Sequence, residues 1–215
     1  MRYLRQHVVM IMNESTEKQI LNKIRKAGRG ALFFVDSFAA IGNGKAINKA
    51  LERLVQSGEL YRVATGIYVR PVKDKYLGMI LPGIDEIAVA IAKRDKARIV
   101  PTGSYAMYKL GLTTQVPLNV VYYTDASSRK IKIGKQTITF KRASSKSVAP
   151  IGDLSKLAIQ ALRTIGKDKV NEEEIQKIRE VLKNEKPYHL QHDLKLAPEW
   201  IRKLLWSVIH GLTNE

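Results

Sequence analysis

Residues 42–71, GNGKAINKALERLVQSGELYRVATGIYVRP, form the stretch that decides the fold of the first part of the chain. Over residues 45–57 the apolar positions recur every three or four residues, which is the spacing of a helix that buries one side. Two β-rich runs follow at 60–63 and 67–70, and the turn between them contains Gly66. The stretch therefore predicts a helix followed by a β-hairpin.

The residues before this stretch supply the first helices of a larger motif. Thr-Glu-Lys-Gln at 16–19 fits a capping box, with Thr16 at the N-cap of a helix. A short helix is expected over 38–41, ahead of the Gly-Asn-Gly turn that opens the quoted stretch. Helix, short helix, turn, helix and hairpin is the order of a winged helix-turn-helix. We assign this motif to residues 13–71 and expect residues 1–12 to form an N-terminal extension.

The polar side of the 45–57 helix predicts contacts with DNA. In a helix-turn-helix the second helix lies in the major groove, where Asn can bond adenine and Lys can donate to guanine or to phosphate. The basic and amide side chains of this helix favour DNA, because a protein-docking surface is richer in aromatic and Met residues. The alternative is a non-enzymatic module that binds protein or RNA through the same surface. The predicted DNA contacts are Asn43, Lys45, Asn48, Lys49 and Arg53 from the helix, and Arg62, Thr65, Tyr68 and Arg70 from the hairpin.

The charge of the chain supports a polyanionic partner. The net charge is +17 over 215 residues, and residues 1–75 and 76–150 carry +8 each, whereas residues 151–215 carry +1. A basic surface attracts phosphate polymers at long range. A second basic run, without an acid among its members, consists of Arg129, Lys130, Lys132, Lys135, Lys141, Arg142 and Lys146. It is either a second surface for phosphate or an acidic partner, or a solvated sheet edge that lysines protect from aggregation.

The remainder of the chain predicts a second domain. Residues 72–82 contain Pro and Gly and are assigned to a linker, and residues 83–215 to an α/β domain. A strand is expected over 118–123, and it is too apolar to lie at the edge of a sheet. A hairpin with one solvent-exposed face is expected over 130–140. After Pro150 the pattern becomes helical. The predicted class is thus α+β, with a winged helix-turn-helix followed by an α/β domain that ends in a helical C-terminal segment.

The residues that carry catalysis or bind metals are scarce. The chain has no Cys, which excludes disulfides, Cys-based zinc sites and Cys nucleophiles. Gly103-Ser104 matches the first residues of a nucleotidyltransferase motif. The paired carboxylates that would hold the metal of such a site are missing, and only Asp125 is nearby. His189 and His192 lie three residues apart without a third ligand and are interpreted as surface histidines. We therefore expect no enzymatic activity, no metal and no cofactor.

The sequence also bears on localisation. No apolar run approaches the length of about 18 residues that a membrane-spanning helix requires. The N-terminal apolar stretch VVMIM is too short for a signal peptide and lacks a small-residue cleavage site. We expect a cytoplasmic protein without a membrane partner.

Two stretches together resemble the AbiEi antitoxins of the abortive-infection type IV toxin–antitoxin systems. They are ALERLVQSGELYRVATGIYVRP at 50–71 and GSYAMYKLGLTTQVP at 103–117, and the resemblance covers residues 14–150. It implies a winged helix that binds operator repeats in double-stranded DNA and represses its own operon. It also implies a C-terminal antitoxin domain that counteracts a nucleotidyltransferase-type toxin, with or without direct contact, in defence against phage. Residues 151–215 match no motif of that family.

Overall fold

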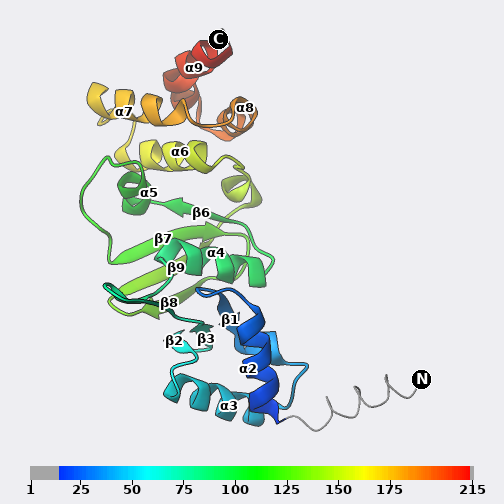
Figure 1. The fold of residues 1–215 in the computed structure, drawn as a ribbon. Coiled ribbons are helices and arrows are strands. Elements are labelled where there is room, and N and C mark those ends of the chain that lie inside the picture. Colours follow the sequence, from blue (N-terminus) through cyan, green and yellow to red (C-terminus); the bar gives the residue numbers. More distant parts are fainter. Residues whose placement is uncertain (1–14, 214–215) are drawn as a thin grey trace. The chain divides into compact units, whose positions relative to one another are not determined.

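A computed structural model describes residues 15–213, so the extension expected over residues 1–12 lies outside the described residues. The chain divides into two compact units with a boundary between Ile87 and Ala88. Both units combine helices with sheets, which confirms the α+β class (Figure 1). They are called the first and the second unit below, and each is described by itself.

The first unit begins with helix α2 (Thr16–Lys26). The sequence predicted Thr16 at the N-cap, but the cap is Ser15, whose hydroxyl accepts a hydrogen bond from the Lys18 amide at 3.3 Å. Ser and Thr are both good N-caps, so the sequence pattern alone left the start uncertain by one residue. The buried residues of α2 are Ile20 and Ile24.

Helix α3 (Gly44–Gln56) follows the predicted periodicity. It begins at the N-cap Asn43, whose Oδ1 accepts a hydrogen bond from the Ala46 amide at 2.9 Å. Its apolar side packs against α2 and the sheet of this unit. The buried residues of α3 are Ile47, Ala50, Leu51 and Leu54.

A three-stranded antiparallel sheet completes the body of the first unit. Strands β1 (Leu32–Phe34), β2 (Tyr61–Ala64) and β3 (Ile67–Val69) lie in the order β1-β3-β2, so β3 is the central strand. The short helix expected over 38–41 is absent, and a 3-10 turn, η1 (Val35–Phe38), takes its place. The Ser37 hydroxyl accepts a hydrogen bond from the Phe34 amide at 3.1 Å and thereby closes this turn directly after β1.

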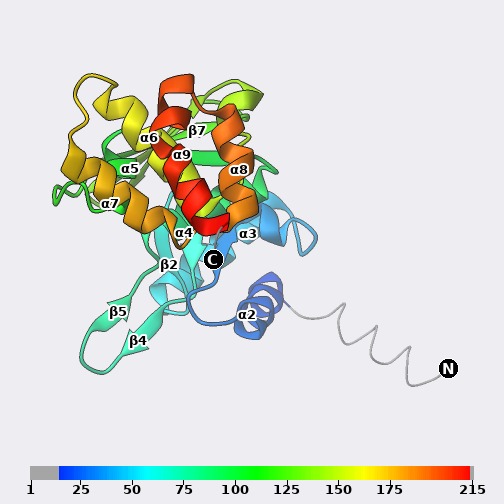
Figure 2. The same ribbon diagram turned by 90° about the horizontal axis from the view of Figure 1, so that it is seen from above.

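The predicted linker contains a β-hairpin of its own. Strands β4 (Val72–Asp74) and β5 (Gly78–Ile80) pair in an antiparallel sheet of two strands, and Figure 2 shows the hairpin projecting from the rest of its unit. The connecting loop has three residues, 75–77, and is followed by Gly78, whose φ of +72° suits a three-residue hairpin loop. The assignment of residues 72–82 to a linker was therefore wrong. Residues such as Pro71 and Gly78 occur at the start and at the turn of a hairpin as often as they occur in a linker.

The second unit is built on a four-stranded mixed sheet in the order β6-β7-β9-β8. Strand β7 is internal, as its apolar sequence predicted, and pairs in parallel with β9. The expected hairpin is formed by β8 and β9. The strands are β6 (Ile99–Thr102), β7 (Asn119–Thr124), β8 (Arg129–Ile133) and β9 (Gln136–Arg142).

The helices of the second unit pack around α6. In Figure 1, α6 lies between the sheet with α5 on one side and the helices α7–α9 on the other, and most of its apolar residues are buried. None of the helices within residues 15–213 has both the length and the apolar character needed to cross a bilayer. The bounds are α4 (Ile84–Arg94), which crosses the unit boundary, α5 (Ser104–Lys109), η2 (Ser145–Val148), α6 (Asp153–Ile165), α7 (Glu172–Leu182), α8 (Pro187–Leu196) and α9 (Glu199–Thr213).

Candidate nucleic-acid interface

The exposed side of α3 brings together three of the predicted DNA contacts. Lys45, Asn48 and Lys49 are all exposed in the N-terminal half of the helix, opposite its buried apolar side. The first turn of α3 carries no acidic residue. Because the N-terminus of a helix has a partial positive charge, the two lysines add to a field that already favours an anion such as phosphate.

Asn43 has a structural role at the start of this helix. Its Oδ1 caps α3 through the Ala46 amide and is therefore not available for a bidentate hydrogen bond with adenine, which needs both ends of the side-chain amide. The residue is exposed, so its Nδ2 group still faces solvent. Asn43 is therefore the N-cap of α3 and not a bidentate reader of adenine.

Arg53 is exposed one turn further along α3 and forms an ion pair with Glu17 of α2, with 3.1 Å between Nη1 and Oε2. Exposed ion pairs contribute only about 0–1 kcal/mol to stability. The guanidinium can therefore exchange Glu17 for a phosphate at little cost. The position of Arg53 is compatible with the predicted phosphate contact.

The β2–β3 hairpin presents only part of the predicted set. Arg62 and Thr65 are exposed. Tyr68 is 7% exposed and belongs to the core, so the prediction of a DNA contact was wrong for this residue. The reason is the pairing of β1 with β3, which places Tyr68 on the central strand.

Arg70 binds its own chain. Its Nη1 donates to the carbonyl oxygens of Arg25 at 2.9 Å and Ala27 at 2.6 Å, at the C-terminal end of α2. The last carbonyls of a helix lack partners within the helix, so the guanidinium satisfies groups that would otherwise need water. The prediction that Arg70 contacts DNA is therefore corrected: its side chain joins the end of β3 to α2.

The second basic run is divided by the structure. Arg129 pairs with Asp95, and its Cζ lies 5.3 Å from the centroid of the Phe140 ring. It is half-buried and engaged within its unit, so its assignment to a basic surface was wrong. The other six residues of the run, Lys130, Lys132, Lys135, Lys141, Arg142 and Lys146, are exposed.

Three lysines of this run share one face of the sheet. Lys130 and Lys132 pair with Thr139 and Thr137 across β8 and β9, and Lys141 follows two residues after Thr139. Side chains two apart on a strand point to the same face. Lys135 lies instead in the β8–β9 turn, Arg142 points to the opposite face and Lys146 belongs to η2.

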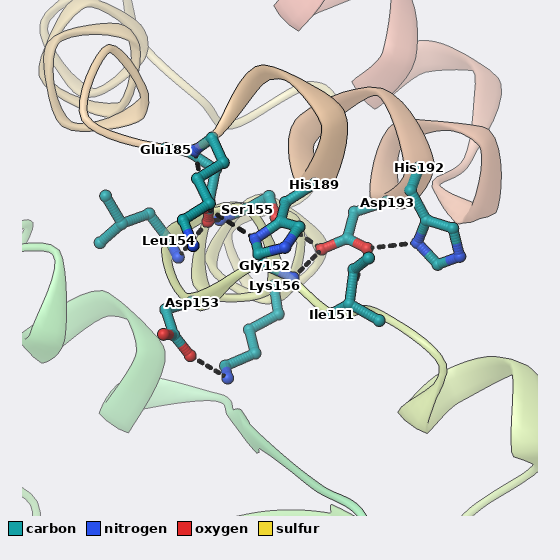
Figure 3. A network of polar contacts seen from close by, with 11 residues as sticks. Ile151, Gly152, Asp153, Leu154, Ser155, Lys156, Glu185, His189, His192 and Asp193 are labelled. Carbon is teal, nitrogen blue, oxygen red and sulfur yellow. Dashed lines mark hydrogen bonds and ion pairs between the residues drawn. The ribbon is translucent and has the colours of Figure 1, made fainter.

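A buried polar network in the second unit went unpredicted. Asp193 of α8 is 0% exposed and accepts hydrogen bonds from the amides of Ile151 and Gly152, at 2.8 and 2.9 Å, and from the Ser155 hydroxyl at 2.5 Å (Figure 3). His192 Nδ1 lies 2.8 Å from Asp193 Oδ1, the oxygen that also accepts from the Ile151 amide. Asp193 is thus the anchor that joins α8 to the segment opening α6.

Glu185 is the second carboxylate of this network. Its oxygens accept hydrogen bonds from the amides of Leu154 at 2.7 Å, Ser155 at 3.1 Å and Lys186 at 3.0 Å. Burial would raise the pKa of Glu185, but these hydrogen bonds outweigh it and the pKa lies below its ordinary value. His189 lies 3.4 Å from the same carboxylate. The two histidines interpreted as surface residues therefore both contact buried carboxylates.

The network stabilises the fold and does not expose a nucleophile. Ser155 is 1% exposed and its hydroxyl is committed to Asp193. Glu185 satisfies two amides in the first turn of α6, which have no partners within the helix, and Asp193 satisfies the two amides directly before the helix. Apart from the bond between Glu185 and the adjacent Lys186 amide, the two carboxylates lie 30–42 positions from the amides that they bind, so no local pattern could have indicated these contacts. Within residues 15–213, no cluster of three or more His, Asp and Glu has an arrangement that would hold a metal ion.

Comparison with known proteins places the chain in a family. A search of solved structures matches the crystal structure of the RV2827C protein from Mycobacterium tuberculosis, with a TM-score of 0.43 and 10% identity over 90% of this chain and 81% of that chain. No protein of curated function matches the sequence. The sequence profile of a family of unknown function, DUF6088, matches residues 19–190, which include most of both units. The chain therefore belongs to the family of unknown function DUF6088.

Proposed function

We propose that the protein is a DNA-binding transcriptional autorepressor that uses residues 13–71 as a winged helix-turn-helix. In this proposal α3 is the recognition helix and the β2–β3 hairpin is the wing. The observation that carries it is the exposed N-terminal half of α3, where Lys45, Asn48 and Lys49 face solvent without a neighbouring acid in the first turn. This combination of cationic and amide side chains suits phosphates and base edges.

The exposed residues divide into two roles. Asn48 and Lys49 read bases, because they lie on the outer side of α3 near its N-terminus. Arg53, Arg62 and Thr65 bind phosphates and thereby set the register of the protein on the duplex, without reading its sequence.

Replacing Asn48 by alanine is expected to weaken binding to the operator by about 1–3 kcal/mol and to relax the base preference at one position, because one side-chain contact with a base is lost. Arg62→Ala should instead weaken all duplexes alike. Fluorescence anisotropy with the DNA upstream of the protein's own gene, and with a scrambled duplex, measures both effects. Gln56→Ala is the control, since it removes an exposed amide at the far end of α3. Equal losses on both duplexes for Asn48→Ala would contradict base reading.

We further propose that the protein is the antitoxin of a toxin–antitoxin operon that defends against phage. This part rests on the resemblance of residues 50–71 and 103–117 to AbiEi antitoxins. The second unit then carries the antitoxin activity, and the first unit adjusts expression of the operon. The toxin is a nucleotidyltransferase encoded beside the antitoxin, and its action is opposed with or without direct contact.

Full-length protein made from an inducible promoter is expected to restore the growth of cells that make the neighbouring nucleotidyltransferase. Asn48→Ala should restore growth equally well, because this substitution weakens operator binding by the first unit and leaves the second unit, which carries the antitoxin activity, unchanged. Colony counts with and without induction measure the rescue. If the unaltered chain fails to rescue at matched expression levels, the antitoxin role is refuted while autorepression can still be tested on DNA.

A further inference from the structure

The β4–β5 hairpin, residues 72–80, displays large apolar side chains at its tip. Tyr76 is 87% exposed and Leu77 is 77% exposed. Both belong to the three-residue loop at the end of a hairpin that projects from its unit (Figure 2). Apolar side chains gathered on a projection indicate an interaction surface, since burying them against a partner removes them from water. We call this hairpin the arm.

The tip of the arm is held in one conformation. Asp74 Oδ1 accepts hydrogen bonds from the amides of both Tyr76 and Leu77, each at 2.8 Å. These two bonds, the one from Leu77 foremost, lower the pKa of Asp74, so its carboxylate stays ionised and directed at the loop. The loop is therefore preorganised, and binding through it costs less entropy than ordering a flexible loop would.

The root of the arm is anchored to the body of its unit. Arg70, directly before the arm, binds the end of α2 through its guanidinium, and its backbone pairs with Gly30 at 2.8 Å and Ala31 at 3.0 Å. Pro71 is buried, and a Cβ added at Gly30 would lie 3.8 Å from a Val72 methyl group. The arm is therefore held by hydrogen bonds both at its root and at its tip.

The charges along the arm point to a polyanion. Lys73 and Lys75 are exposed, whereas the one acid of the arm, Asp74, is committed to its loop. At the root, Arg29, Arg70 and Lys73 contribute to a pocket of about 210 Å³. The acid of that pocket, Glu59, is paired with Arg25. Cations thus accompany the arm from its root to the base of its tip.

We propose that the arm inserts its tip into the minor groove of the bound duplex, with Leu77 as a wedge between base pairs and Tyr76 beside it, and so kinks the operator. Proteins that insert apolar side chains in this way offset the cost of unstacking with additional phosphate contacts. An acidic protein would be recognised by the lysines but has no need of a rigid apolar wedge. The proposal rests on the DNA-binding function proposed above.

The dimensions of the arm fit this role. Its strands have three residues each, and a strand rises about 3.4 Å per residue, so they span about 10 Å. The minor groove is about 7.5 Å deep. The tip is therefore long enough to reach the base pairs. The groove is only about 6 Å wide, so entry of two paired strands requires it to widen, as the proposed kink towards the major groove would do.

The test measures the bend of the operator separately from its affinity. Full-length protein is added to the DNA upstream of its own gene, labelled at both ends for energy transfer. The unaltered protein is expected to bend this duplex by roughly 20–90°. Tyr76→Ser combined with Leu77→Ser should straighten it and weaken binding about tenfold, without changing the salt dependence. Both side chains are exposed, so the variant keeps its fold.

Two further variants separate the charges from the wedge. Lys73→Gln combined with Lys75→Gln should keep the bend and reduce the slope of log K against log salt by about 1.8, at about 0.9 for each phosphate contact. Leu118→Ser is the matched control, because it removes a comparably exposed leucine of the second unit (68% against 77% for Leu77), and it should alter neither quantity.

The possible outcomes separate a failure of the proposed wedge from a failure of the DNA-binding function on which it rests. A duplex that stays straight, or one that the Tyr76/Leu77 variant bends as much as the unaltered protein does, overturns the wedge and leaves autorepression intact. Loss of toxin rescue in this variant with unchanged bending would show that the tip binds a protein, and would also overturn the wedge. If the unaltered protein binds no duplex, the proposed function and the arm are refuted together.

Discussion

Asp193→Ala is expected to lower the free energy of unfolding of the second unit by about 3–5 kcal/mol. The substitution removes a fully buried carboxylate and leaves the amides of Ile151 and Gly152 and the Ser155 hydroxyl without their acceptor. Each buried polar group that loses its partner costs about 1–3 kcal/mol. Urea denaturation followed by circular dichroism measures the loss, because the helices of this unit dominate the signal.

Asp168→Ala provides the matched control for this substitution. Asp168 is exposed in the loop between α6 and α7, and surface substitutions of this kind usually change stability by less than about 0.5 kcal/mol. Asp193→Asn should fall between the two, because an amide retains one oxygen as an acceptor but loses the charge. Equal denaturation midpoints for Asp193→Ala and Asp168→Ala would show that Asp193 does not anchor α8 to α6.

Gly152→Ala is expected to cost at least about 2 kcal/mol at the same place, for a steric reason. A Cβ at this position would lie 2.2 Å from Ser155 Oγ and 2.6 Å from Glu185 Oε2, so the network would have to move apart. Overpacking a filled core typically costs about 1–3 kcal/mol, and hydrogen bonds are lost in addition. The backbone conformation is not the obstacle, since the φ of Gly152 is −76°. Thermal denaturation gives the change.

Gly28→Ala controls for the general effect of replacing a glycine. A Cβ there meets no atom within 4 Å, and Gly28 does not have a positive φ. Such a substitution restricts the unfolded chain and should range from neutral to stabilising by about 1 kcal/mol. If Gly152→Ala behaved in the same way, the tight packing of Ser155 and Glu185 around residue 152 would be disproved.

The exposed side of α3 was predictable because its signal is local. The apolar spacing of residues 45–57 predicted α3 and its buried side, and hence which of its lysines and amides face solvent. The same holds for the β8–β9 hairpin, where alternating Lys and Ile residues placed Lys130 and Lys132 on one face. In both cases the neighbours that determine a side chain's direction lie within one turn or one strand.

The sequence by itself thus determined the α+β class, the exposed side of α3 and the two hairpins at 60–70 and 130–140. Only the tertiary structure decided which of the basic and aromatic residues remain exposed. Tyr68 is buried because β1 pairs with β3, and Arg129 meets Asp95 from 34 positions away. Asp193 likewise reaches Gly152 across 41 positions. The periodicity of a sequence shows which residues share the buried or the exposed face of a helix or strand. It carries no information on which distant strand, carbonyl or carboxylate will lie beside them in the folded chain.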